Sequence, residues 1–455
     1  MKNLTLEHIA QACQGIYRGS EADKTREVTG IFTDSRKIQE GSLFVPIKGA
    51  RADGHDFIEG VMDKGALATL SEKDLGEKPY PYIQVESSLQ AVKDIAEYYL
   101  KQLAIPVVGI TGSVGKTSTK EMIASVLAQK YKVLKTQGNF NNELGLPLTV
   151  FNLRDEHEIA VLEMGISDFG EMHRLAKIAR PDTCVITNIG LCHLEFLKSR
   201  DGILKAKTEI FDFLREDGHI VLNGDDDKLA TIEEVKGIKP VFFGLDSHHE
   251  IWADEVQPQG LRGISCRIHM GEKSFGVLIP VPGQHMVYNA LAAAAVGGIY
   301  GLSPEEIQNG IQSLQPVSGR FHIINTDRYT IIDDCYNANP VSMKASLDVL
   351  ADALGRKVAI LGDMGELGTD QADMHREVGV YAASRNIDVL LCVGELSAYL
   401  AEAAQLTAPA REIRHFQSKE ELLQDIPHIL EKGDNILVKA SHFMEFGKIL
   451  EALQE

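Results

Sequence analysis

Residues 111–117, TGSVGKT, combine two glycines with a lysine and a threonine in a spacing suited to binding phosphate. Glycine has no Cβ and accepts positive φ, so main-chain N–H groups beside the two glycines can turn toward an anion. Lys116 would add a positive charge for the outer phosphates, and Thr117 would add a hydroxyl for Mg²⁺. The pattern departs from G-x-x-x-x-G-K-[ST] at its first position, where Ile110 stands. A glycine-rich turn without a nucleotide is the alternative.

The elements around this loop follow the order of a nucleotide-binding unit. An apolar run at 105–110 predicts a strand that enters the loop, and a helix-period segment at 116–129 predicts a helix that leaves it. Two further apolar runs, 159–165 and 183–190, predict parallel strands of the same sheet. Ligands of such sheets gather at the carboxyl ends of the strands. The loop should therefore lie at the ligand-binding edge of a mostly parallel sheet.

Two ionisable residues follow these later strands. Glu163 stands at the end of one strand, where its carboxylate can hold Mg²⁺ beside the loop, and a capping or solvated role is the alternative. His193 lies just beyond the next strand, and the same argument is weaker for it because most lone histidines bind no metal.

Two residues on predicted helices have competing interpretations. Lys207 falls on a helix predicted over 201–213, where a lysine is usually solvated rather than catalytic. Asn289 heads a helix rich in small residues, and its amide can pair with an adenine edge. A plain helix cap is the alternative for Asn289.

The flanking segments form two further α/β units. Residues 1–100 predict a small unit whose TDSR turn at 33–36 offers a hydroxyl and a cation for an anion, although most such loops are only connections. Turn residues at 316–319 mark a boundary, beyond which a second doubly wound unit lacks a phosphate loop. Its polar loops at 334–340 and 362–368 follow strands and should face a cleft.

Composition limits the class of protein. The 455 residues suggest about three domains, and a hydrophobic fraction of 44% with 24% charged residues is typical of soluble globular proteins. The net charge of −19 argues against a nucleic-acid or anionic-membrane surface. The six cysteines form no C-x-x-C pair, which suits free thiols, and the N-terminal residues lack an apolar signal core. We therefore expect a cytoplasmic protein without membrane insertion.

Taken in order, the motifs resemble those of the Mur ligases of peptidoglycan synthesis over nearly the whole chain. They are TDSR at 33–36, TGSVGKT at 111–117, NFNNELG at 139–145, NIG at 188–190 with His193, KAK at 205–207, NALA at 289–292, GR at 319–320, DDCYNANP at 333–340 and GDMGELG at 362–368. That family uses a T-G-x-x-G-K-[ST] loop, so Ile110 in place of the first glycine agrees with the family pattern. The residues KASH at 439–442 stand where the family more often has KGSR, which weakens any role assigned to that segment.

The resemblance implies an α/β protein of three domains. Residues 1–103 would form a small N-terminal α/β domain that binds the UDP-linked substrate. Residues 104–315 would form a central P-loop ATPase domain with a mostly parallel sheet. Residues 316–455 would form a C-terminal Rossmann-like domain that closes over the active site.

The implied activity is that of an ATP-dependent carboxylate–amine ligase, ADP-forming. It would add D-alanyl-D-alanine to UDP-N-acetylmuramoyl-tripeptide through an acyl phosphate, in cell-wall biogenesis and hence in cell shape and division. Other Mur-type or folylpolyglutamate-type ligases are the nearest alternatives, and a nucleotide switch without ligase chemistry is a further one. The expected partners are the two small-molecule substrates, without nucleic acid, and a monomer is the simplest expectation.

The resemblance also implies roles for individual residues, including a reversal for Lys207, which matches a family lysine that is carbamylated by CO₂. The expected catalytic residues are Lys116, Glu163, His193 and Lys207. The expected ATP-binding residues are Gly112, Ser113, Val114, Gly115, Lys116, Thr117, Ser118, Asn289, Arg320 and Asp334. The expected substrate-binding residues are Thr33, Ser35, Arg36, Asn142, Tyr336, Asn337 and Asn339. The expected Mg²⁺ ligands are Thr117, Glu163, His193 and carbamylated Lys207.

Overall fold

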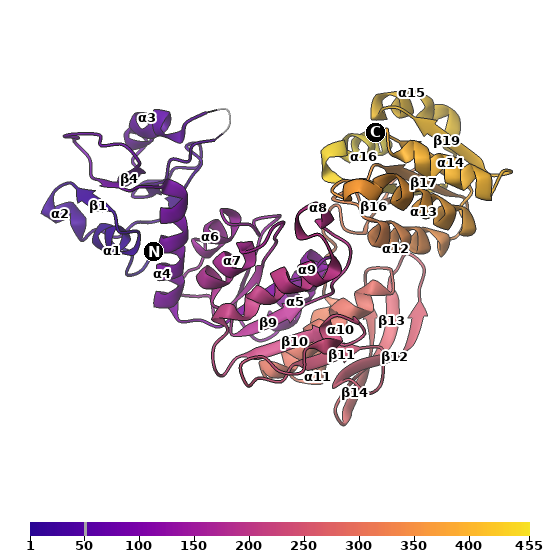
Figure 1. The fold of residues 1–455 in the computed structure, drawn as a ribbon, viewed down its shortest axis with the longest axis horizontal. Helices are drawn as coiled ribbons and strands as arrows, with labels where there is room; N and C mark the ends of the chain where they lie inside the picture. The colour runs from indigo at the N-terminus through magenta and orange to yellow at the C-terminus, as the bar shows by residue number, and fades with distance from the viewer. Residues whose placement is uncertain (50–51) are drawn as a thin grey trace.

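The computed structural model describes residues 1–49 and 52–455. Within them the strands form three sheets, of five, nine and six strands, each with helices packed against it. Figure 1 shows the sheets as three lobes that follow one another along the chain. The predicted α/β fold with three domains is therefore confirmed. The sheets fall within 16–84, 107–279 and 322–439, while the exact domain limits stay a prediction.

The N-terminal sheet is mixed, with the order β1-β5-β4-β3-β2. Only β1 runs antiparallel to its neighbour among these described strands. The strands are β1 (Ile16–Arg18), β2 (Ile31–Phe32), β3 (Leu43–Phe44), β4 (Ala68–Ser71) and β5 (Tyr82–Gln84), and the helices are α1 (Leu6–Ala12), α2 (Glu21–Lys24), α3 (Ile58–Asp63) and α4 (Ser88–Leu103).

Helix α4 joins this first lobe to the central one. The side chain of Ser87 accepts a hydrogen bond from the main-chain N–H of Gln90, which caps the start of the helix. Its apolar face is buried, and the hydroxyl of Tyr99 donates to the main-chain oxygen of Leu153 at 2.8 Å. The apolar cores of the two lobes are continuous through this helix.

The central sheet has the order β14-β13-β12-β11-β10-β9-β6-β8-β7. Its strands are β6 (Val107–Thr111), β7 (Val133–Lys135), β8 (Ile159–Glu163), β9 (Thr183–Ile186), β10 (His219–Asn223), β11 (Val241–Gly244), β12 (Ile251–Pro258), β13 (Ile264–Met270) and β14 (Lys273–Ile279). Its helices are α5 (Lys116–Leu127), α6 (Gly145–Val150), α7 (Glu171–Ala179), α8 (Leu194–Leu197), α9 (Arg200–Thr208), α10 (His285–Ile299) and α11 (Pro304–Gln312). In the order of the sheet, neighbouring strands from β7 at one edge to β12 are parallel. Strands β13 and β14 then add an antiparallel extension.

The strands that carry the site residues lie in the interior of the domain. Every residue of β6, β8 and β9 is buried, as expected for parallel strands that are covered by helices on both faces. Because β9 and β8 flank β6, their carboxyl ends meet at one edge of the sheet. The loop after β6, Glu163 and the segment after β9 are therefore neighbours.

The C-terminal sheet has the order β15-β16-β20-β17-β18-β19 and is parallel apart from β15. Its strands are β15 (His322–Asn325), β16 (Thr330–Asp333), β17 (Lys357–Gly362), β18 (Val389–Val393), β19 (Glu412–Phe416) and β20 (Asn435–Lys439). Its helices are α12 (Pro340–Ala351), α13 (Gln371–Ser384), α14 (Ser397–Thr407), α15 (Lys419–Ile429) and α16 (Gly447–Gln454). Among the described residues, none of the helices is both long and apolar enough to span a membrane.

Candidate active site

The phosphate loop joins β6 to α5, and its main-chain conformation requires both glycines. Gly112 has a φ of +148°, and a Cβ at this position would collide with Oγ1 of Thr187. Gly115 has a φ of +85° and precedes the first residue of α5. The N–H groups in the first turn of a helix have no intrahelical acceptor, so they can bind an anion at this loop. The predicted order of strand, glycine loop and helix is confirmed.

Lys116 lies folded over the phosphate loop. Its Nζ donates to the main-chain oxygen of Gly112 at 2.9 Å and to that of Ser113 at 3.4 Å. These carbonyl groups hold the ammonium group close to the loop's N–H groups. A bound phosphate would meet a positive charge that is already positioned.

Glu163, at the end of β8, faces the same loop and is buried. Its Oε1 accepts hydrogen bonds from the Thr117 hydroxyl at 3.2 Å and from Nδ2 of Asn141 at 2.8 Å. Its Oε2 is also buried; Nζ of Lys120 lies 3.9 Å from it, but no group in residues 1–49 and 52–455 donates a hydrogen bond to it. A buried oxygen without a donor is costly, and a hard cation would satisfy it.

The donor set near Glu163 therefore fits Mg²⁺. The Thr117 hydroxyl and the Glu163 carboxylate supply the oxygen ligands that this ion prefers. No group of three or more His, Cys, Asp or Glu side chains in the described part of the chain is placed to hold a metal. Mg²⁺ usually keeps water and substrate phosphates among its ligands, so it needs few protein ligands.

His193 lies at the border between the central and C-terminal domains. It precedes α8 with a φ of +50°, and its Nδ1 is 2.8 Å from Oε2 of Glu366, in the loop after β17. The neighbouring imidazole of His193 lowers the pKa of the Glu366 carboxyl. The two side chains are close, but Nδ1 of His193 makes no well-directed hydrogen bond within the described residues.

Lys207 lies in the last turn of α9 and is fully buried. Its Nζ has no hydrogen-bond partner among the residues that the structure describes. Burial, together with the nearby charge of Lys116, lowers the pKa of this amine from an ordinary value of 10.5 to about 7. Contrary to the sequence argument from residue type alone, this lysine is not solvated.

A cavity of about 420 Å³ lies between the central and C-terminal domains and brings both sets of predicted residues together. From the C-terminal side, the Arg320 guanidinium stacks on the Tyr336 ring, 4.0 Å from its centroid. The predicted site residues that line the cavity are Ser113, Val114, Gly115, Lys116, Thr117, Ser118, Asn142, Glu163, His193, Arg320, Tyr336, Asn337 and Asn339.

Several asparagines of this cavity already use their side-chain oxygens. Asn142 accepts from the main-chain N–H of Gly145 at 2.8 Å, at the start of α6. Asn339 caps α12 and accepts from the N–H of Ser342 at 2.9 Å. Their Nδ2 groups are the donors left for a substrate. Direct substrate contact at these residues stays a prediction.

Three predicted ATP-binding residues, Gly112, Asn289 and Asp334, lie outside the cavity lining. Asn289 is buried in α10, a full turn after the helix begins, and its Oδ1 accepts from the Thr119 hydroxyl at 3.0 Å. It is therefore not a helix cap, and the expectation that it heads its helix is wrong because α10 begins at His285. Asp334 is buried and pairs with Lys439 at 2.6 Å. Adenosine contacts by Asn289 and Asp334 stay predictions.

The TDSR turn follows β2 in the N-terminal domain and does not line this cavity. Arg36 has 87% of its side chain exposed and pairs with Asp34 at 2.8 Å. Thr33 and Ser35 are half-buried beside it. An exposed cation on a short turn is available to a large ligand that reaches across two domains. The roles of Thr33, Ser35 and Arg36 stay predictions.

The sequence argument gave little weight to the segment 439–442, whose buried residues hold the C-terminal side of the cavity. Nζ of Lys439 donates to the main-chain oxygen of Asn337 at 3.1 Å as well as to Asp334. Oγ of Ser441 accepts from the N–H of Gly365 at 2.9 Å. The segment after β20 therefore connects the two polar loops that face the cavity. The polar residues at the end of this strand are the sequence signal that could have indicated the connection.

Known families match the chain over most of its length. Residues 27–109 match the model described as Mur ligase family, catalytic domain. Residues 110–297 match the Mur ligase middle domain, and 319–442 match the Mur ligase, glutamate ligase domain.

Individual relatives and solved structures agree with the family match. A UDP-N-acetylmuramoyl-tripeptide–D-alanyl-D-alanine ligase of Bacillus subtilis is 39% identical, with 99% of this chain and 98% of the relative covered. Its counterpart in Escherichia coli is 34% identical, with 100% and 99% covered. The MurF structure of Acinetobacter baumannii superimposes with a TM-score of 0.89 at 32% identity, covering 99% of this chain and 98% of that one.

A MurF ligase of Thermotoga maritima in complex with ADP has a TM-score of 0.82 at 31% identity, covering 93% of this chain and 97% of that one. The phosphate loop, the cavity between two domains and the matches over the full length agree with one another. The chain therefore belongs to the Mur ligase family and is of its MurF type.

Proposed function

We propose that this chain joins D-alanyl-D-alanine to UDP-N-acetylmuramoyl-tripeptide and converts ATP to ADP and phosphate in the reaction. Relatives that match over their full length are named for this activity. The observation that carries the proposal is the cavity in which the Lys116 loop of the central domain faces Arg320 of the C-terminal domain. Such a cleft can hold a nucleotide on one side and an acceptor on the other.

The chemistry needs activation because a carboxylate is a poor electrophile. A carboxylate oxygen of the tripeptide attacks the γ-phosphorus of ATP, the bond from phosphorus to the ADP oxygen breaks, and an acyl phosphate forms. The amine nitrogen of D-alanyl-D-alanine then attacks the carbonyl carbon. The C–O bond to phosphate breaks, and the amide, phosphate and one proton are released. No side chain has to act as a nucleophile.

The residues around the cavity stabilise charge and exclude water. Lys116 would stabilise the negative charge that develops on ADP, and the N–H groups of the loop would hold the phosphates. Arg320 adds a cation from the opposite domain. Closing the two domains would protect the acyl phosphate from hydrolysis.

Mg²⁺ is proposed as the metal, held by Thr117 and Glu163 with His193 nearby. When bound, this ion would neutralise phosphate charge in the transition state. The buried Oε2 of Glu163, which accepts no hydrogen bond from the described residues, supports this assignment.

Lys207 is proposed to react with CO₂. A neutral amine nitrogen attacks the carbon of CO₂, an N–C bond forms, and one proton leaves the nitrogen for solvent. A buried amine that lacks a partner in the described chain is suited to this reaction, because burial favours its neutral form. The resulting carbamate would replace a buried amine by an anion able to face Mg²⁺.

The N-terminal domain is proposed to bind the uridine nucleotide through Thr33, Ser35 and Arg36. Arg36 can pair with a diphosphate because its guanidinium is exposed and carries a permanent charge. The enzyme would work in the cytoplasm, where ATP is available, and a monomer is sufficient for the cavity described above.

The direct test is an assay with ATP, Mg²⁺, D-alanyl-D-alanine and UDP-N-acetylmuramoyl-tripeptides ending in either lysine or diaminopimelate. We expect phosphate release that depends on both substrates and matches pentapeptide formation. The variant Lys116→Ala should lose about 10²–10³-fold in turnover. Phosphate release that ignores D-alanyl-D-alanine and yields no amide would contradict the proposal.

A further inference from the structure

The segment 187–190, directly after β9, lies against the phosphate loop. The N–H of Ser113 donates to the main-chain oxygen of Asn188 at 3.0 Å, and the N–H of Val114 donates to Oδ1 of Asn188 at the same distance. Nδ2 of Asn188 donates back to the oxygen of Val114 at 2.9 Å. The conformation of the phosphate loop is therefore coupled to the conformation of this segment.

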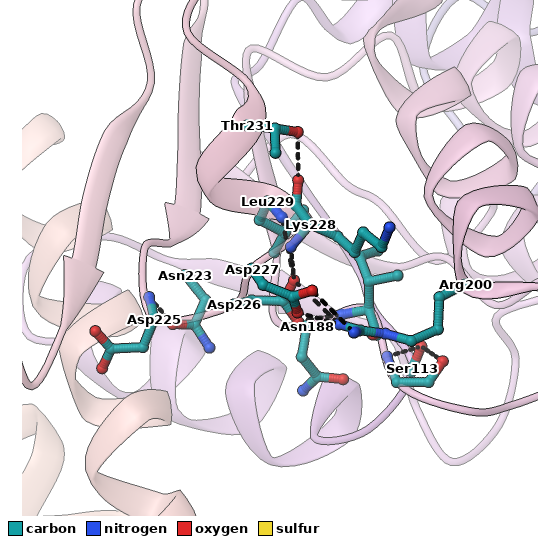
Figure 2. Close-up of polar contacts among 12 residues, drawn as sticks. Ser113, Asn188, Arg200, Asn223, Asp225, Asp226, Asp227, Lys228, Leu229 and Thr231 are labelled. Atoms are coloured by element: carbon teal, nitrogen blue, oxygen red, sulfur yellow. Dashed lines mark hydrogen bonds and ion pairs between the residues drawn. The ribbon is translucent and has the colours of Figure 1, made fainter.

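Two charged side chains hold the opposite side of the same segment. The N–H of Ile189 donates to Oδ2 of Asp226 at 2.7 Å. The main-chain oxygen of Ile189 accepts from Nε of Arg200 at 2.8 Å. Figure 2 shows Arg200 and Asp226 beside Asn188, with Ser113 of the phosphate loop close by. Both polar groups of one residue are thus bonded to ionised side chains, which make stronger hydrogen bonds than neutral ones.

The two charged residues come from different elements and are themselves fixed. Asp226 follows β10, is largely buried, and its Oδ1 accepts from the N–H groups of Lys228 at 3.0 Å and Leu229 at 3.1 Å. Arg200 is the first residue of α9, and its NH1 donates to Asp227 at 3.0 Å. Neither Asp226 nor Arg200 lines the active-site cavity.

We propose that Asp226 and Arg200 are positioning residues for nucleotide binding, acting through Ile189 and Asn188 on the phosphate loop. The inference rests on the proposed function, since it assumes that this loop binds ATP. With both groups of Ile189 held, Asn188 stays in place, and the N–H groups of the phosphate loop that are not bonded to Asn188 are oriented before a ligand arrives. Preorganised donors bind and stabilise charge better than donors that must first be ordered.

A simpler interpretation is that Asp226 and Arg200 only stabilise the fold. The two interpretations differ in what a substitution changes. A purely structural role predicts a lower melting temperature with unchanged affinity for nucleotide in the protein that remains folded. A positioning role predicts weaker nucleotide binding at a temperature where the variant is fully folded.

The experiment measures ADP affinity by titration calorimetry on the whole protein, together with the melting temperature of the ligand-free form. The variants are Asp226→Ala, Arg200→Ala and Arg200→Lys. The matched control is Asp201→Asn, which breaks an exposed ion pair with Lys228 at 2.5 Å in the same region without touching Ile189. Steady-state kinetics with ATP varied provides a second readout.

We expect Asp226→Ala and Arg200→Ala to weaken ADP binding about tenfold, the penalty of ordering roughly one more backbone residue on binding. The KM for ATP should rise by a similar factor, and Arg200→Lys should recover much of the affinity because its ammonium can still donate to Ile189. The control should bind like the wild type. Unchanged ADP affinity in both alanine variants would overturn this inference alone, whereas a wild type that fails to bind ADP would overturn the proposed function as well.

Discussion

Lys207 in the central domain and Lys439 in the C-terminal domain are both buried lysines outside the lining of the active-site cavity, but they differ in their partners. Nζ of Lys439 lies 2.6 Å from the Asp334 carboxylate and also donates to the main-chain oxygen of Asn337. Nζ of Lys207 has no partner in the described residues. Both side chains are 2% exposed or less, so burial alone does not distinguish them.

The difference indicates two kinds of role. A buried ion pair with further hydrogen bonds stabilises a particular arrangement, here the loop that presents Tyr336 and Asn337. A buried amine without a partner destabilises the protein unless it stays neutral, and a neutral amine is reactive. We infer that Lys439 of the C-terminal domain stabilises the fold, whereas Lys207 of the central domain takes part in the chemistry of the active site.

Replacing Lys439 should have the largest effect on stability. Lys439→Met leaves Asp334 buried without its cation, which typically costs about 3–5 kcal/mol. Urea unfolding followed by circular dichroism should show a clearly lower midpoint. In CO₂-free buffer the matched variant Lys207→Met removes an unpaired amine and should leave the midpoint unchanged or raise it. Equal losses in both variants would break the distinction between the two lysines.

Replacing Lys207 should instead remove activity. Lys207→Arg keeps a positive charge but cannot form a carbamate, so we expect turnover to fall by about 10²–10³-fold, as for the loss of one preorganised charged group. The wild type supplied with ¹³C-bicarbonate should show a carbamate carbon by NMR that is absent from the variant. Full activity in Lys207→Arg, or no carbamate signal in the wild type, would refute the chemical role.

The two lysines should also differ in how stability responds to pH. The pKa of Lys207 is lowered to about 7 in the folded protein, from an ordinary value of 10.5. Between these values the unfolded state binds more protons, so raising the pH from about 7 toward 10.5 should increase stability. Urea midpoints of the wild type and Lys207→Met, compared in CO₂-free buffer at rising pH, should therefore shift in favour of the wild type. Parallel pH profiles would argue against an unmodified amine with a lowered pKa.

The smallest expected effect concerns Ser346, whose hydroxyl is 2.7 Å from Oδ2 of Asp334. Ser346→Ala removes one neutral donor and leaves Lys439 in place. The expected cost is about 1 kcal/mol, well below that of Lys439→Met. A urea midpoint as low as that of Lys439→Met would mean that the hydroxyl, rather than the lysine, stabilises Asp334.

Part of the site could be predicted from the sequence because it depends on local order. The glycines of the phosphate loop are adjacent to the strand and helix that they join, and Glu163 ends a strand next to β6 in the sheet. Parallel strands place their carboxyl ends at one edge, so this half of the site follows from motif spacing and strand order.

The rest depends on contacts between distant segments. Asp334 and Lys439 are 105 residues apart, and neither spacing nor composition predicts their pairing. The sequence suggests that Asn289 stands at a helix start, but α10 begins at His285. This start is hard to predict because no side chain caps it. The antiparallel extension formed by β13 and β14 is also not predicted, because an alternation of strands and helices indicates only the parallel part of the sheet.

The central claim is that ATP activates the tripeptide carboxylate as an acyl phosphate. The most direct measurement uses UDP-N-acetylmuramoyl-tripeptide labelled with ¹⁸O in its terminal carboxylate, followed by mass spectrometry of the phosphate released. Because the C–O bond to phosphate breaks when the amine attacks, each phosphate should carry one ¹⁸O atom from the substrate. Unlabelled phosphate formed in step with the amide product would contradict this account.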